Sequence, residues 1–94
     1  MQHEKTVRAM FMGHEIVARN VFGLAKGDII NEAVLIIDDA IVDRSTELSA
    51  SKTRLSTTLV DRDNRHAVEV LFGGIFIIRM KILIDGRKIA GDLR

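Results

Sequence analysis

Residues 75–90 read IFIIRMKILIDGRKIA, and this stretch carries the clearest structural signal in the chain. Every even-numbered residue from Phe76 to Ile84 is apolar, whereas the odd-numbered positions include Arg79 and Lys81. A period of two, with many β-branched residues, is typical of a β-strand. The Asp85-Gly86 pair that follows suits a type I′ turn, in which both turn residues need a positive φ. The stretch therefore predicts a β-hairpin.

The rest of the second half also alternates. Apolar residues fall mainly at every second position in Thr53–Asp61 and in His66–Phe72, which predicts two further strands. The polar residues 62–65 between them are typical of a turn. Gly73-Gly74 predicts a tight reversal or a bulge before the next strand. Four consecutive strands are thus expected in the second half.

The first half contains a similar pattern. Residues 34–42 (VLIIDDAIV) can be aligned with residues 81–89 (KILIDGRKI), because Asp38 and Asp85 lie 47 residues apart in a chain of 94. His14 and His66 also align if a gap is allowed. The sequence therefore predicts one globular domain, residues 1–94, with an internal duplication into repeat halves 1–47 and 48–94.

We predict an all-β fold of about eight short, mostly antiparallel strands in a small sandwich or barrel. One alternative stays open, because apolar residues between Val7 and Val21 also recur at helical spacing. An α+β fold with one or two N-terminal helices would fit that spacing. Gly13 interrupts the first such helix, and the many β-branched residues of segment 30–41 disfavour the second.

Two segments, residues 34–37 and 75–78, are apolar on both sides of the strand pleat. Such runs are typical of strands that are buried on both faces. In a sandwich of this size one face of each strand is normally in water. We therefore expect a loop formed by residues 23–31, or a second subunit, to cover them. The candidate residues for self-association in a homodimer are Phe76, Ile78 and Met80.

The composition is that of a folded chain, with 47% apolar residues, 14 Lys and Arg, 13 Asp and Glu, and a formal net charge of +1. This balance provides no field for attracting phosphates, and Trp and Tyr are absent, so nucleic-acid binding is not expected. The absence of Cys excludes disulfides and thiolate metal sites. Charged residues interrupt the most apolar stretch, so no membrane span is expected. With no visible signal peptide, a cytoplasmic location is predicted.

Histidine side chains are the groups of this chain that normally titrate near neutral pH. If the halves are duplicated, His14 and His66 begin equivalent strands and could meet near the pseudo-symmetry axis, with Glu15 behind them. A ligand or proton-relay role requires that convergence. His14, Glu15 and His66 are therefore the candidate ligand-binding residues. No catalytic or metal-ligating set is recognised, and no cofactor is expected.

The hairpin at residues 81–89, and its apparent copy at 34–42, resemble hairpins in the small β-sandwich domains of the Fas apoptotic inhibitory molecule family. The resemblance implies a non-enzymatic interaction domain and transfers no site residues. We therefore predict a non-catalytic β domain that binds another protein or itself. The alternatives are a small-molecule or metal-binding domain that uses the interior between the halves, and a small enzyme that uses His14 or His66.

Overall fold

The computed structural model describes residues 2–48, 53–74 and 77–94 of the chain. Within these ranges the fold is all-β, so the predicted class is confirmed and the helical alternative is wrong. No helix in this part of the chain is long and apolar enough to cross a membrane. The strands are β1 (Gln2–Phe11), β2 (His14–Ala25), β3 (Asp28–Ile37), β4 (Ala40–Ser45), β5 (Arg54–Asp61), β6 (Asn64–Gly73), β7 (Arg79–Ile84) and β8 (Arg87–Gly91).

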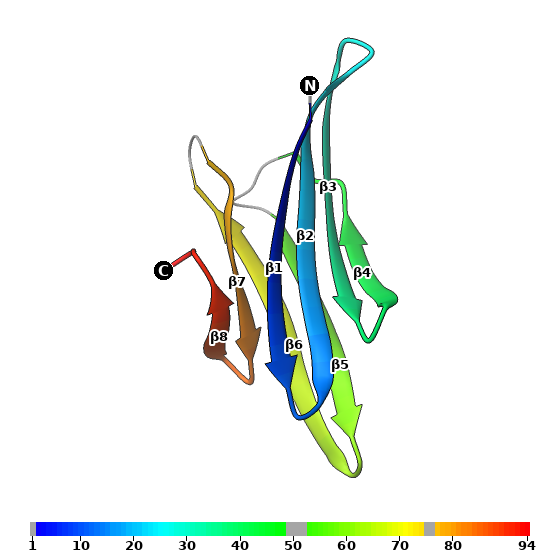
Figure 1. Ribbon diagram of the computed structural model, residues 1–94, viewed down its shortest axis with the longest axis vertical. Coiled ribbons are helices and arrows are strands. Elements are labelled where there is room, and N and C mark those ends of the chain that lie inside the picture. Colours follow the sequence, from blue (N-terminus) through cyan, green and yellow to red (C-terminus); the bar gives the residue numbers. More distant parts are fainter. Residues whose placement is uncertain (1, 49–52, 75–76) are drawn as a thin grey trace.

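The strands form two four-stranded antiparallel sheets, in which neighbours along the chain are also neighbours in the sheet. Sheet A has the order β1-β2-β3-β4, and sheet B has the order β5-β6-β7-β8. The two sheets lie face to face, with sheet A in front in Figure 1. The architecture is therefore a two-layer sandwich, in which the first half of the sequence forms one sheet and the second half forms the other.

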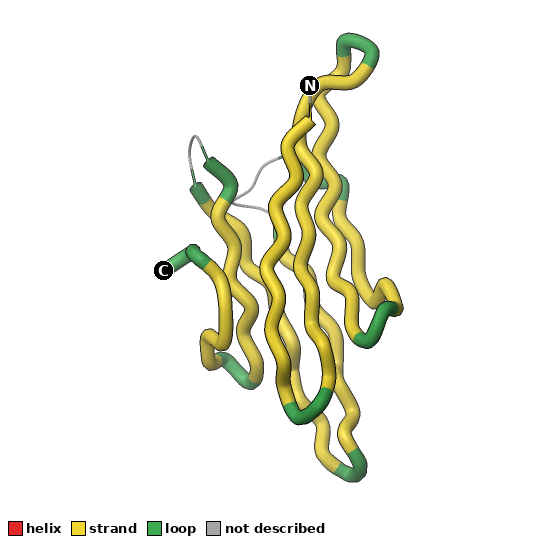
Figure 2. The backbone as a smooth tube through the Cα atoms, viewed as in Figure 1, coloured by secondary structure: helices red, strands yellow, loops and turns green. Residues whose placement is uncertain are grey.

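Tight two-residue turns connect strands within both sheets (Figure 2). Asp85 and Gly86 have φ values of 51° and 80°, and Asp38 and Asp39 have values of 49° and 67°. Both pairs are in the left-handed region that a type I′ turn requires, which Gly adopts without steric cost and Asp tolerates. The two predicted hairpin tips are confirmed.

Several predicted boundaries are wrong. The turn expected over residues 62–65 is shorter, because Asn64 already pairs with Asp61 in the β5–β6 ladder. Residues 23–31 are not a covering loop; they belong to β2 and β3 except for the turn at Lys26-Gly27. Strand β7 begins at Arg79, later than expected. A β-hairpin needs only two residues between its strands, so polar residues near a turn continue the ladder.

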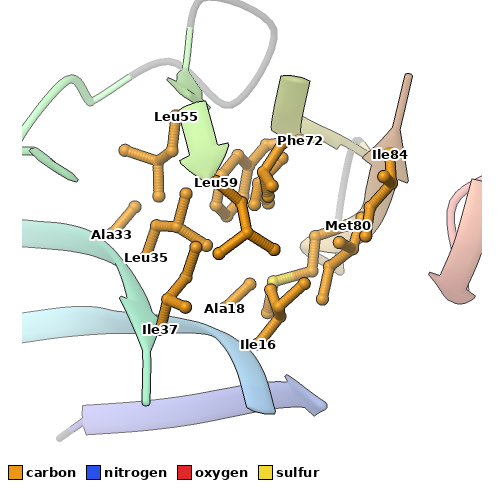
Figure 3. Packing of buried hydrophobic residues seen from close by; sticks show 13 residues of the cluster. Ile16, Ala18, Ala33, Leu35, Ile37, Leu55, Leu59, Phe72, Met80 and Ile84 are labelled. Atoms are coloured by element: carbon orange, nitrogen blue, oxygen red, sulfur yellow. The ribbon is translucent and has the colours of Figure 1, made fainter. Parts of the chain in front are cut away.

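The core lies between the sheets and is almost entirely aliphatic (Figure 3). Sheet A contributes alternate residues of β2 and β3, and sheet B contributes alternate residues of β5, β6 and β7, as period-two patterning requires. The fully or nearly fully buried members are Ile16, Ala18, Ala33, Leu35, Ile37, Leu55, Leu59, Val68, Val70, Phe72, Met80, Ile82 and Ile84.

Two apolar residues in the middle of the outer face of sheet A, Val17 and Val34, are also shielded. Val34 points away from the core, because its neighbours Ala33 and Leu35 point into it, yet it is only 2% exposed. Its register partners on β2 and β4 are Arg19 and Arg44. Long arginine side chains can lay their aliphatic stems along apolar neighbours. The burial of Val34 on this face therefore requires neither the expected loop nor a second subunit.

The two sheets differ in length. Strands β2 and β3 have 12 and 10 residues, whereas β7 and β8 have 6 and 5. The β2–β3 hairpin consequently projects past the end of sheet B in a molecule 48 Å long (Figure 1). We call residues 21–32 of this hairpin the overhang. Sheet B does not cover it.

Replacing Leu35 by Ala should lower the free energy of unfolding by about 2–5 kcal/mol, because the fully buried side chain leaves a cavity between the sheets. Ile41→Ala, on an edge strand where Ile41 is 52% exposed, is the control and should change stability by less than about 0.5 kcal/mol. Denaturant unfolding measures both values. Equal effects would contradict the assigned core.

Candidate functional site

The predicted candidates His14 and His66 each contact an aspartate at a hairpin tip of their own sheet. His14 is the first residue of β2, and its Nδ1 lies 2.6 Å from Oδ2 of Asp38. His66 is on β6, and its Nδ1 lies 2.7 Å from Oδ2 of Asp85. Asp38 follows β3 and Asp85 follows β7, so the same residue types make the same contact in both sheets.

The two aspartates also bond to the backbone next to each histidine. Oδ1 of Asp38 accepts the N–H of Glu15 at 2.9 Å, and Oδ1 of Asp85 accepts the N–H of Ala67 at 2.9 Å. The N–H groups of Asp38 and Asp85 donate in return to the carbonyls of Glu15 and Ala67, at 3.0 Å and 2.8 Å. We call each arrangement a His–Asp clasp. Each clasp joins a hairpin tip to the adjacent strand.

The second nitrogen distinguishes the two histidines. Nε2 of His14 lies 3.3 Å from Oδ1 of Asp61 on β5, so this ring connects sheet A to sheet B. Nε2 of His66 is buried and has no hydrogen-bond partner among the described residues. The His66 ring instead packs edge-to-face against Phe11 of β1, with 5.0 Å between the ring centroids. The two histidines thus contact different groups.

The charges around His14 favour its protonated form. Its hydrogen bond with Asp38, and next that with Asp61, raise the pKa of His14 above the ordinary value of 6.5. The bond from His14, followed by the N–H of Glu15, lowers the pKa of Asp38 below 3.8. An imidazolium with both nitrogens bound to carboxylates has no lone pair for a metal or a substrate proton. This geometry suits a structural bridge.

Glu15 does not stand behind the histidine as a carboxylate partner. Its side chain lies 3.7 Å from Arg8, with both groups largely in solvent, and its backbone N–H is the group that meets Asp38. Among residues 2–48, 53–74 and 77–94, no group of three His, Asp or Glu side chains is placed to hold a metal ion. The predicted ligand-binding residues therefore lie in clasps rather than around a vacant centre.

The candidate self-association residues have different positions. Met80 is fully buried between the sheets, so its side chain does not lie on the surface. Ile78 is partly buried and packs against the core. Phe76 lies outside the described residues. These positions do not form an exposed apolar surface within the described chain.

The overhang is the apolar surface that the sequence reasoning missed. Phe22 and Leu24 follow Ile16 and Ala18 at alternate positions of β2, and Ile29 shares the alternation of Leu35 on β3. They therefore lie on the core face of sheet A. Beyond the end of sheet B, Phe22, Leu24 and Ile29 are 41%, 54% and 60% exposed. The apolar residues Phe22 and Leu24 at alternate positions were the available signal, whereas the sequence analysis expects a loop over residues 23–31.

A polar row separates the core from the overhang. Lys5 and Asn20 are register partners on β1 and β2. Nζ of Lys5 donates to the carbonyl of Ile78 at 3.0 Å and also contacts the carboxylate of Asp92, both near the end of sheet B. Asn20 is 3% exposed and donates through Nδ2 to Oδ1 of Asn31 at 2.7 Å. The closed core ends at this row, and the exposed apolar residues begin beyond it.

A cavity of about 460 Å³ lies along the overhang, away from the space between the sheets. Its lining comes from β2, from β3 and from the segment that follows β4. The residues are Val21, Ile29, Ile30, Asn31, Glu32, Thr46 and Leu48.

Comparison with known proteins found no match to any protein-family model, to any curated protein or to any solved structure. The resemblance to the Fas apoptotic inhibitory molecule family therefore remains a prediction.

The clasp at His14 predicts a pH-dependent stability. The stability that protonated His14 adds to the folded protein is fully present below about pH 6.5, and it is lost as the pH rises through the raised pKa of His14. The contribution of the clasp through Asp38 is present above about pH 3.8 and is lost as pH falls through the lowered pKa. The thermal midpoint of the parent protein should therefore decrease as the pH rises from about 6.5 through the raised pKa of His14.

His14→Gln should reduce that fall, because glutamine cannot carry the proton. His3→Gln, at an exposed position of β1, is the matched control and should leave the pH profile unchanged. Melting curves followed by circular dichroism across the pH range give the comparison. An H14Q profile parallel to that of the parent would show that the clasp does not contribute through its charge.

Proposed function

We propose that this chain is a non-catalytic interaction domain that associates with a second copy of itself through the core face of the overhang. The observation that carries the proposal is the exposure of Phe22, Leu24 and Ile29 on a face that is buried elsewhere in the sheet. A contiguous apolar patch outside a closed core is characteristic of an interaction site.

The shape of the patch supports a symmetric pair. It belongs to a single hairpin and is bounded by the polar row of Lys5 and Asn20. A twofold axis can bring the same patch of two chains into contact. Each Phe22 is then removed from water, because it packs against the apolar face of the partner. The patch consists of three side chains from one hairpin, so the expected dimer is weak, with a dissociation constant on the order of micromolar or above.

The clasps support a non-catalytic role. A general base or nucleophile needs a nitrogen that can reach a substrate. Both nitrogens of His14 are bound to carboxylates, and the ring of His66 packs on Phe11 with its Nε2 buried. The small-molecule and metal alternatives placed a ligand between the halves, where core side chains pack. A cytoplasmic location remains part of the proposal.

We also infer an internal duplication. It is supported by the equal strand order of the two sheets and by the two clasps, which match in residue type and backbone bonding. Under this proposal the clasp was present in the ancestral unit. The contacts of His14 with Asp61 and of His66 with Phe11 differ because they arose separately after the duplication.

Phe22→Ser should weaken dimerisation about tenfold, because the dimer would bury the 41% of Phe22 that is still exposed in each of its two copies, and burying a whole Phe side chain contributes about 1.5–3 kcal/mol. Light scattering coupled to size exclusion, over a range of protein concentrations, measures the dissociation constant. Val60→Ser is the control, since Val60 is 56% exposed on sheet B, outside the patch, and should leave association unchanged.

A parent protein that is monomeric up to about millimolar concentration would overturn the self-association proposal. So would equal weakening by the Phe22 and Val60 variants, because the overhang would then have no special part. Circular dichroism of each variant confirms that the fold is kept before association is compared.

A further inference from the structure

The edge of β3 is open within the overhang. Strand β4 ends at Ser45, which pairs with Ala33, so its ladder with β3 covers only the second half of that strand. Residues 28–32 pair with β2 on one side. On the other side, no strand of the described chain is paired with them, although the side chain of Asn31 donates to the carbonyl of Glu47 in the segment that follows β4.

The open edge offers backbone hydrogen-bonding groups. The turn at Lys26-Gly27 makes Ala25 and Asp28 the closing pair of the hairpin, so the N–H and C=O of Asp28 point towards β2. Successive residues of a strand point these groups to opposite sides. The N–H and C=O groups of Ile29 and Asn31 therefore point outward, and no backbone bond joins them to a described residue outside the ladder.

The cavity follows this edge. Residues 29–32 are consecutive, and their side chains alternate between the two faces of sheet A, yet all four line the same cavity. A cavity lined in this way runs along the strand rather than over one face. Thr46 and Leu48, in the segment after β4, provide the other wall. The space of about 460 Å³ thus lies where a further strand would add to β3.

The charges at the edge of β3 indicate which kind of strand would bind there. Asp28 and Glu32 on β3, and Glu47 beside the cavity, are exposed, and none of them forms an ion pair within the described chain. Two β3 edges paired antiparallel about Ile30 would set Asp28 of one copy opposite Glu32 of the other. Like charges at directly opposite positions destabilise a strand pair. The edge therefore disfavours a second copy and favours a cationic strand.

We propose that the β3 edge binds an extended segment of another protein, in which Lys or Arg alternates with aliphatic residues. The segment adds as a strand, with backbone bonds to Ile29 and Asn31, aliphatic contacts to Val21, Ile30 and Leu48, and cations near the acidic rim. This site goes beyond self-association, because it uses the edge of β3 rather than the core face of the overhang.

The test is a titration of the isotope-labelled protein with a short capped peptide in which Val alternates with Lys. Binding should protect the amide hydrogens of Ile29 and Asn31 from exchange, because both donate to the added strand. The double variant Asp28→Lys/Glu32→Lys should weaken binding about tenfold or more. Asp63→Lys, which reverses an exposed charge at the β5–β6 turn, is the control and should bind as the parent does.

Three outcomes overturn the inference: no binding of the Val-Lys peptide, equal binding of the matching Val-Glu peptide, or binding without protection of Ile29 and Asn31. The titration is repeated with Phe22→Ser, whose self-association is measured separately by light scattering. Peptide binding that persists in this variant supports the edge site even if no dimer exists. A dimer without peptide binding refutes the edge site alone.

Discussion

Burial of one aliphatic layer between two sheets is the interaction on which the rest of this structure depends. The chain has no Cys to form disulfides, so packing must hold the two sheets together. Each strand meets this requirement by turning every second residue inward. The inner residues of β2 and β3, such as Ile16 and Leu35, therefore meet those of β6 and β7, such as Val68 and Ile82, across a common interior. Buried polar side chains such as that of Asn20 lie at an end of this layer.

The His–Asp clasps are consequences of that arrangement. A type I′ hairpin tip places an Asp with a positive φ next to the start of the preceding strand in the sheet, where a backbone N–H is available. A histidine one residue earlier completes the bond with its ring. The sequence analysis predicts a ligand-binding role for His14 and His66, whereas their partners in the structure are carboxylates at hairpin tips. Partner identity depended on strand register, which the pattern of apolar residues alone did not specify.

The difference in sheet length creates the two surfaces on which the proposed interactions depend. Sheet A continues past the polar row of Lys5 and Asn20. In the hairpin that exposes Phe22 on its core face, residues 28–32 of β3 have no described strand beside them on the side away from β2. One structural feature thus supplies an apolar face and an acidic strand edge that no described strand covers. The two surfaces suit different partners, because apolar contact tolerates a second copy, whereas the carboxylates at Asp28 and Glu32 repel one.

Local signals in the sequence determined the strand character and the hairpin tips. Alternation of apolar residues and the Asp85-Gly86 and Asp38-Asp39 pairs act over a few residues, so their effect can be predicted without knowing the rest of the chain. Tertiary structure alone decided where sheet B ends against sheet A. That choice buried Met80 and left Phe22 exposed, although both belong to alternating apolar runs. Because the hydrophobic effect is non-directional, the identity of an apolar residue does not indicate whether an opposing sheet will cover it.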